Sequence, residues 1–341
     1  MSSDAQTIRQ GSPAPSCCAL VLTYNGRHHL EGCLPSLLRA AGGVPGGCPV
    51  VVVDNRSSDG SIDWLRVAFP QVEVYIAKRN DYLFSLNEVV ASRAEDVVLI
   101  LNNDMHFDER FICALLPHFL DKDLFAATSR VMDWEGSCVT MGLRIGEIRR
   151  FWFYNRLHHN STQPSIALDA GGASAAYRRS MFLELGGFDS LYHPAYWEDA
   201  DLSYRAWLRG LKIVFEPASI VYHRSGGSWL EAKGRSRLVR LARRNEVLFT
   251  ARNVGGWLFV CVYLSLLPFR VIRDMFLGRH SDWRGMVDAA PRIPAALWRR
   301  FQQRHVLIRR DSDFLSEIRA AADSAGARQE SGSIPEGQAR C

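Results

Sequence analysis

Short apolar runs alternate with amphipathic segments through the first third of the chain. Residues 18–23 (CALVLT) and 50–54 (VVVVD) are almost wholly apolar and end in polar residues. Such runs are typical of strands buried on both faces of a parallel sheet. Residues 29–38 lie between them, with apolar side chains at helical spacing, and a glycine-rich stretch follows. The pattern predicts a β-α-β unit.

The alternation continues to residue 101 with a helix after Asp54, a strand, a second helix and another buried strand. The last three are expected at 72–76, 86–94 and 97–101. Repeated β and α segments predict a doubly wound, mostly parallel α/β sheet, whose ligands bind beyond the carboxyl ends of the strands. We therefore expect the chemistry at residues 23–25, 54–58 and 102–104.

The second half of the chain changes character twice. Residues 130–169 predict strands and loops of an acceptor-side lobe, and 199–208 predict a helix. Residues 235–250 then predict a strongly basic helix. Residues 253–269 carry no charge, but a transmembrane helix needs about 20 apolar residues. An interfacial or re-entrant helix pair that ends at Pro268 is the favoured interpretation, with a spanning helix and a buried core helix as alternatives.

Charge is segregated along the 341 residues. The net charge is only +5, yet residues 203–310 hold 21 Lys and Arg against 6 Asp and Glu. Such a block favours anionic lipid or nucleic acid, although a solvated helical face would look the same. The eight cysteines show no CxxC spacing and the N-terminus has no apolar signal core, which favours a reduced compartment over secretion.

Three clusters of polar residues have the composition of a catalytic site. Asp104 follows a predicted strand, where a carboxylate either binds a divalent cation or caps a turn. Glu198, Asp199 and Asp201 stand at a predicted helix start, where they either stabilise the helix or include a general base. His223 follows another predicted strand and is either a metal ligand or an ordinary hydrogen-bonding residue.

Taken together, six stretches resemble family 2 of the inverting glycosyltransferases, which have the GT-A fold, and in particular bacterial rhamnosyltransferase-like and galactofuranosyltransferase-like members. They are VLTYNGRHHLEGCLPSLL, VVVDNRSSDGSIDWL, LNNDM, LELGGFD, WEDADLSYRAWLRG and VYHRSGGSW, in the order of the family. The resemblance covers about residues 18–229. It implies transfer of a sugar from a nucleotide diphosphate donor to a hydroxyl group, with inversion at the anomeric carbon.

The resemblance also implies roles for individual residues. Asp199 would be the catalytic base. The other implied roles are nucleotide-sugar binding by Thr23, Tyr24, Asn25, Asp54 and Asn103, acceptor binding by Trp197, Glu198 and Gly172, and binding of Mg²⁺ or Mn²⁺ by Asp104 and His223.

Two departures from the family pattern concern the donor site. Residues 80–87 read NDYLFSLN where many members carry a glycine-rich segment, and Asn102 occupies the first position of the DxD-type motif. The first departure changes the expected shape of the donor pocket. The second replaces a charged metal ligand with a neutral oxygen.

The chain is thus expected to comprise a disordered N-terminus (1–15), a GT-A domain (16–230), a basic helical membrane-associating region (231–310) and a polar, partly disordered tail (311–341). The expected acceptor is a polyprenol-diphosphate-linked saccharide of a bacterial cell-surface polymer. The expected location is the cytoplasmic face of the membrane, as a peripheral protein on anionic lipid, with no nucleic acid bound. The donor nucleotide remains open among UDP, dTDP and GDP. The alternative is a catalytically idle scaffold or nucleotide-binding protein of the same fold.

Overall fold

The computed structural model describes residues 15–159, 161–224 and 234–330. Its first half is a parallel sheet in the order β4-β1-β2-β3, formed by β1 (Cys17–Thr23), β2 (Val50–Asp54), β3 (Glu73–Ile76) and β4 (Val97–Asn102). Along β1, Cys18 and Leu20 enter one hydrophobic core, whereas Ala19 and Val21 enter another. The sheet is therefore buried on both faces, as the apolar runs predict.

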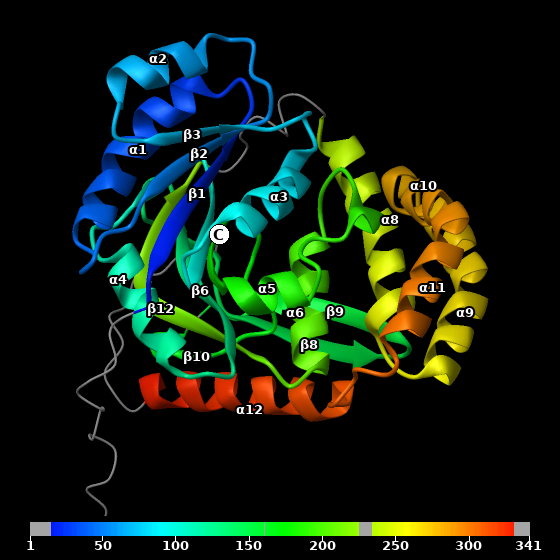
Figure 1. The fold of residues 1–341 in the computed structure, drawn as a ribbon. Helices are drawn as coiled ribbons and strands as arrows, with labels where there is room; N and C mark the ends of the chain where they lie inside the picture. Colours follow the sequence, from blue (N-terminus) through cyan, green and yellow to red (C-terminus); the bar gives the residue numbers. More distant parts are fainter. Residues whose placement is uncertain (1–14, 160, 225–233, 331–341) are drawn as a thin grey trace, which may run out of the picture.

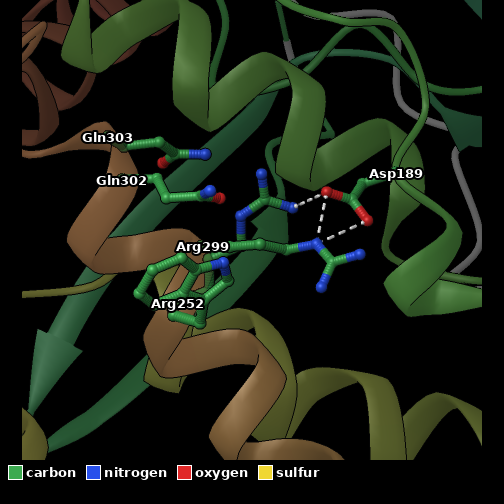
Figure 2. Close-up of a pocket in the computed structure, with 6 residues that line it drawn as sticks. Asp189, Arg252, Arg299, Gln302 and Gln303 are labelled. Carbon is green, nitrogen blue, oxygen red and sulfur yellow. Dashed lines mark hydrogen bonds and ion pairs between the residues drawn. The ribbon is translucent and has the colours of Figure 1, made fainter.

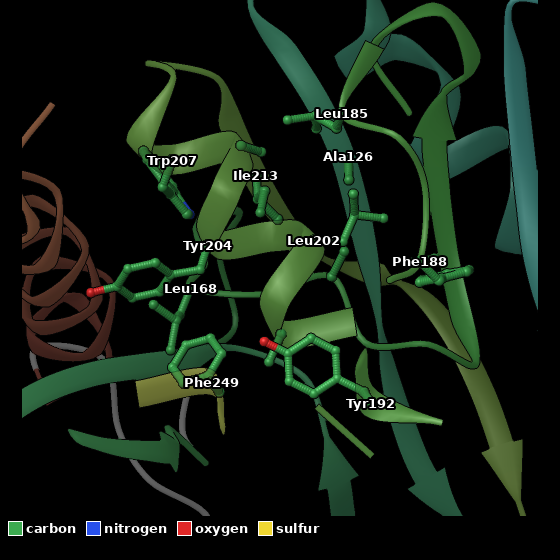
Figure 3. Packing of buried hydrophobic residues seen from close by; sticks show 14 of the residues in the cluster. Ala126, Leu168, Leu185, Phe188, Tyr192, Leu202, Tyr204, Trp207, Ile213 and Phe249 are labelled. Atoms are coloured by element: carbon green, nitrogen blue, oxygen red, sulfur yellow. The ribbon is translucent and has the colours of Figure 1, made fainter. Parts of the chain in front are cut away.

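Helices cover both faces of this sheet. The helices α1 (Arg27–Gly42), α2 (Ser61–Ala68) and α4 (Phe111–Leu115) pack on one side. The helices α3 (Ser85–Ser92), α5 (Arg179–Glu184) and α6 (Glu198–Leu208) pack on the other. Helix α6 is buried along almost its entire length, with Leu202, Tyr204 and Trp207 in the larger core (Figure 3). The predicted α/β architecture is confirmed.

The second half of the chain extends the sheet with mixed directions. The antiparallel strand β11 (Ser174–Arg178) lies between β4 and β6 (Leu124–Asp133), and β12 (Lys212–His223) runs parallel to β6. Short strands complete this lobe: β5 (Met105–Phe107), β7 (Val139–Met141), β10 (Ser165–Ile166) and the hairpin β8 (Arg144–Arg149) with β9 (Trp152–Leu157). The end of β12 pairs with β5, so His223 lies opposite Met105.

Beyond the sheet, the C-terminal helices form a bundle beside α6, labelled α8 to α11 in Figure 1. They are α8 (Arg235–Asn253), α9 (Trp257–Phe276), α10 (His280–Ala289) and α11 (Ile293–Gln303). Helix α9 does not end at Pro268 as the sequence suggests. The proline lies on an exposed side of the helix, where water can satisfy the carbonyl group that its missing N–H leaves unpaired. Within the described ranges, no helix is long and apolar enough to cross a membrane.

The expected polar tail differs from the structure over its first part. Residues 311–330 form α12 (Asp311–Glu330), which packs against β8 and β10. Phe314 stacks on Trp207 at 5.7 Å between ring centroids, and Ile318 is fully buried. The buried apolar positions are 314, 315, 318, 322 and 325, and two of the five are alanines. The apolar side therefore does not stand out in a polar sequence, which explains the difference. Residues 1–14 and 331–341, where disorder is expected, lie outside the described part.

Several arginines of the basic block are used inside the molecule, while about half of the arginines in the block are exposed. The Arg252 side chain is 4% exposed and contacts Asp189 at 2.7 Å (Figure 2). It also contacts Asp201 at 3.2 Å. Arg299 also binds Asp189, and Arg243 binds Asp282 at 2.7 Å. Part of the segregated charge thus forms an internal network. It joins the helical bundle to the sheet domain.

Candidate active site

A cleft of about 1180 Å³ opens along the carboxyl edge of β1 and β4. It is lined by Thr23, Asn103 and Asp104, which follow or end these strands, and by Asp199 at the start of α6. The cleft therefore brings together segments that are almost two hundred residues apart in the sequence. It lies where ligands of open α/β sheets bind.

The turn after β1 packs closely against the end of β4. Asn103 donates a hydrogen bond from Nδ2 to Thr23 Oγ1 at 2.8 Å. A Cβ atom at Gly26 would collide with this Asn103 amide, so glycine is required there for the close approach. Thr23 and Asn103 thus form one hydrogen-bonded unit at the floor of the cleft.

The loops after β1 and β2 are tied to each other. Asn25 accepts a hydrogen bond from the Ser58 backbone N–H at 2.7 Å, and its own N–H donates to Ser57 Oγ at 2.8 Å. Tyr24 is 50% exposed at the cleft wall, where its ring is available for stacking. Asp54 is different, because it is buried at 2% exposure, does not line the cleft, and accepts from the Ser57 N–H at 3.0 Å. The hydrogen bond from Ser57 to Asp54 stabilises the loop that follows β2.

Asp104 and His223 meet at one end of the cleft. His223 Nε2 lies 3.4 Å from Asp104 Oδ2, because β12 returns to pair with β5 immediately after Asp104. The other oxygen, Asp104 Oδ1, is buried and has no hydrogen-bond partner within the described residues. An unsatisfied carboxylate oxygen beside an imidazole fits a divalent cation that takes its remaining ligands from donor phosphates. No cluster of three or more His, Cys, Asp or Glu side chains in the described ranges forms a complete protein site.

Asp199 is held in the cleft by two backbone N–H donors. Its Oδ2 accepts from the Gly172 N–H and its Oδ1 from the Ala200 N–H, both at 2.8 Å. Gly172 itself lines the cleft, and a Cβ atom there would lie 3.5 Å from Asp199 Oδ2. Gly172 therefore contributes a backbone N–H that orients the carboxylate toward the cleft.

The two residues before Asp199, Trp197 and Glu198, also line the cleft. Trp197 has φ = 74° at the N-cap of α6, and its ring packs on Phe249 at 4.8 Å between centroids while lining the cleft. Glu198 is 7% exposed, and its Oε2 has no hydrogen-bond partner in the described part of the chain. Burial, followed by the neighbouring Asp199 charge, raises the pKa of Glu198 well above its ordinary value. Glu198 is thus suited to carry a proton at this wall.

The polar cluster around Asp169 was not singled out as a site from the sequence. Asp169 lines the cleft at 4% exposure and accepts from Asn155 Nδ2 of β9 at 2.6 Å. Arg144 of β8 lies 3.8 Å from its other oxygen. Burial raises the pKa of Asp169 to about 6, with Arg144 opposing the rise and the Asp199 charge adding to it. The only sequence signal was the position of Asp169 shortly before the Gly171-Gly172 turn.

Asp201, the third carboxylate of the 198–201 cluster, faces away from the cleft. It is fully buried, and its Oδ1 accepts from Tyr192 Oη and Asn253 Nδ2, both at 2.7 Å. Its Oδ2 accepts from Arg205 Nε at 2.7 Å. Asp201 therefore stabilises the fold and takes no part in the cleft, because side chains two residues apart lie on nearly opposite faces of an α-helix.

The segment that departs from the glycine-rich pattern borders the cleft through Asn80, Tyr82 and Leu83. Tyr82 adopts φ = 55°, a conformation that glycine reaches more easily. Asn87 exchanges two hydrogen bonds of 2.9 Å with the Phe188 backbone, which ties this segment to the 186–189 turn. The side chains of Tyr82 and Leu83 thus occupy space at the edge of the cleft. The hydrogen bonds of Asn87 hold this segment in place.

Comparison with protein families gives one match. Residues 18–186 match the model for glycosyl transferase family 2. No curated protein matches the sequence of the chain.

Solved structures share its fold at low sequence identity. One is GalNAc-T7 with UDP, GalNAc and Mn²⁺, at a TM-score of 0.52 and 16% identity over 71% of this chain and 48% of that chain. Another is the mannosyltransferase PcManGT from Pyrobaculum calidifontis in complex with GDP-Man and Mn²⁺, at 0.51 and 14% over 86% and 89%. The chain thus spans about half of the GalNAc-T7 chain and most of PcManGT. Both likenesses concern the fold.

Proposed function

We propose that the protein, whose residues 18–186 match glycosyl transferase family 2, is a glycosyltransferase that transfers a sugar, with inversion, from a nucleotide diphosphate to a saccharide hydroxyl. The observation that carries this proposal is one cleft that is lined both by Asp199 and by Thr23, Asn103 and Asp104 at the carboxyl edge of the sheet. A nucleotide sugar on that edge would direct its anomeric carbon toward the Asp199 wall. The two glycosyltransferase structures with UDP and GDP-Man have the same fold.

In this proposal Asp199 accepts the proton of the acceptor, and Asp104 and His223 hold the cation. The acceptor hydroxyl forms a bond to the anomeric carbon, the bond from that carbon to the diphosphate breaks on the opposite face, and the hydroxyl proton passes to Asp199. The Gly172 N–H keeps the carboxylate oriented during this step. A divalent cation held by Asp104 and His223 would supply neutralisation of the charge on the departing diphosphate.

On the acceptor side, the proposal is a lipid-linked saccharide of a bacterial surface polymer, reached from the cytoplasmic face of the membrane. Asp169, Asn155 and Arg144 would bind its hydroxyl groups, since a carboxylate accepts and an amide or guanidinium donates. The rhamnosyl or galactofuranosyl type of donor is part of the same proposal. Its support is the resemblance of the motifs to such enzymes.

The test is release of nucleotide diphosphate from UDP-, dTDP- and GDP-sugars by the wild type and by Asp199→Asn. The wild type is expected to turn over one donor class. Asp199→Asn is expected to lose about 10²–10⁴-fold of the rate, because an amide cannot accept the proton. Donor binding, measured by calorimetry with the nucleotide diphosphate, should remain. Asp63→Asn is the matched control, since the Asp63 side chain is 90% exposed on α2 and away from the cleft.

Two results would contradict the proposal. Retention of more than about a tenth of the wild-type rate, against the loss expected for a general base, would move that role to another carboxylate, and Asp169 and Glu198 both line the same cleft. No turnover of any nucleotide sugar by the wild type would favour the catalytically idle alternative.

A further inference from the structure

Helix α9 leaves one side uncovered by the rest of the protein. Val260, Tyr263 and Leu267 of α9 are buried against the molecule. The exposed large apolar residues of α9 and the residue after it are Trp257, Leu258, Leu266, Phe269, Ile272, Met275, Phe276 and Leu277. The helix has 20 residues, so this strip is about 30 Å long. Exposed apolar surface of such length marks an interaction site in a soluble fold.

The tip of the β8–β9 hairpin continues this strip. Phe151, at the tip, is 42% exposed, and its ring centroid lies 5.7 Å from that of Phe259 in α9. The adjacent Trp152 packs on Tyr263 of α9 at 5.1 Å. We call Phe151 and the exposed residues of α9 given above the α9 face. Strand β9 also carries Asn155 into the cleft, so one hairpin connects the α9 face with the acceptor wall.

Both ends of the α9 face carry an excess of positive charge. At the hairpin, Arg149, Arg156 and Arg319 all pair with the one carboxylate of Glu147. Near the end of α9, Arg273 and Arg279 share Asp274. The side chains of Arg149, Arg273 and Arg279 are 52–62% exposed. Cations therefore flank the apolar strip.

We propose that the α9 face is the surface by which the enzyme lies on an anionic lipid bilayer, with α9 in the plane of the interface. This inference rests on the proposed lipid-linked acceptor and names the surface that would bring the cleft to it. An apolar strip flanked by arginines matches the acyl boundary and the anionic headgroups. A symmetric contact with a second copy would instead place identical positive ends in one interface. Attachment is chiefly apolar, because the α9 face presents nine exposed large apolar residues against the three exposed arginines Arg149, Arg273 and Arg279.

The test is flotation of the full chain with phosphatidylcholine vesicles and with vesicles that also contain phosphatidylglycerol. The wild type is expected to float with the anionic vesicles and to keep much of that binding in high salt. Phe269→Ser combined with Phe276→Ser, at positions 71% and 89% exposed, should reduce vesicle partition by about tenfold or more, because two inserted rings are lost. Leu120→Ser with Val67→Ser is the matched control, at positions 52% and 84% exposed away from the α9 face.

The outcomes separate this inference from the proposed function. Equal vesicle binding by the Phe269/Phe276 variant and the wild type would overturn it. A lipid-free wild type that is dimeric, with a monomeric Phe269/Phe276 variant, would show that the face joins two copies and would also overturn it. Donor hydrolysis in lipid-free solution is measured in parallel, and both variants should retain it. Vesicle binding without any donor turnover would contradict the proposed function alone.

Discussion

Arg252→Met removes the cation at the centre of the network that joins the helical bundle to the sheet domain. Arg252 is 4% exposed and contacts two carboxylates, Asp189 and Asp201, of which Asp201 is fully buried. Removing one member of a buried ion pair costs about 3–5 kcal/mol, because the remaining charge stays buried. Asp189 keeps Arg299 and Asp201 keeps Arg205. We therefore expect the lower end of this range, a loss of about 3 kcal/mol in the free energy of unfolding.

The assay is equilibrium urea denaturation followed by tryptophan fluorescence, with the slope compared between variants so that a change in midpoint reports stability. Arg310→Met is the control, because Arg310 belongs to the same basic block but is exposed. It should change the free energy of unfolding by no more than about 0.5 kcal/mol. An Arg252→Met variant as stable as Arg310→Met would refute the internal network and return the basic block to a surface role.

Two further predictions concern the cleft. In calorimetry, Asp104→Ala should abolish the dependence of nucleotide diphosphate affinity on Mg²⁺ or Mn²⁺. A chelator should lower the affinity of the wild type in the same way. Equal affinity of the wild type with and without metal would show that Asp104 has a structural role only. Glu198→Gln should remove a pH dependence of stability, because the pKa of Glu198 in the folded state is raised above 4.5. The folded state therefore binds more protons than the unfolded state. As pH rises from about 4.5 through the raised pKa, the wild type should lose stability relative to the variant. Parallel denaturation midpoints for the two proteins across this window would show that the buried carboxyl is not responsible.

Local patterns in the sequence determined most of the first half of the fold. Runs of apolar residues predicted β1, β2 and β4 to within a residue or two at each end, because a strand buried on both faces tolerates no other composition. The same logic placed Thr23 and Asp104 at one sheet edge, since parallel strands end together. Where spacing was less distinctive, as in the polar helix α12 and across Pro268, the local pattern was insufficient.

The tertiary structure alone decided which distant residues meet. His223 reaches Asp104 only because β12 pairs with β5, and Asp169 enters the cleft only because β9 brings Asn155 to it. Asp201 belongs to an acidic cluster at a predicted helix start and Arg252 to the basic block, yet each is buried against the other. Periodicity reports which face of an element is buried, not which element covers it. Such pairings depend on long-range packing, which no local pattern encodes.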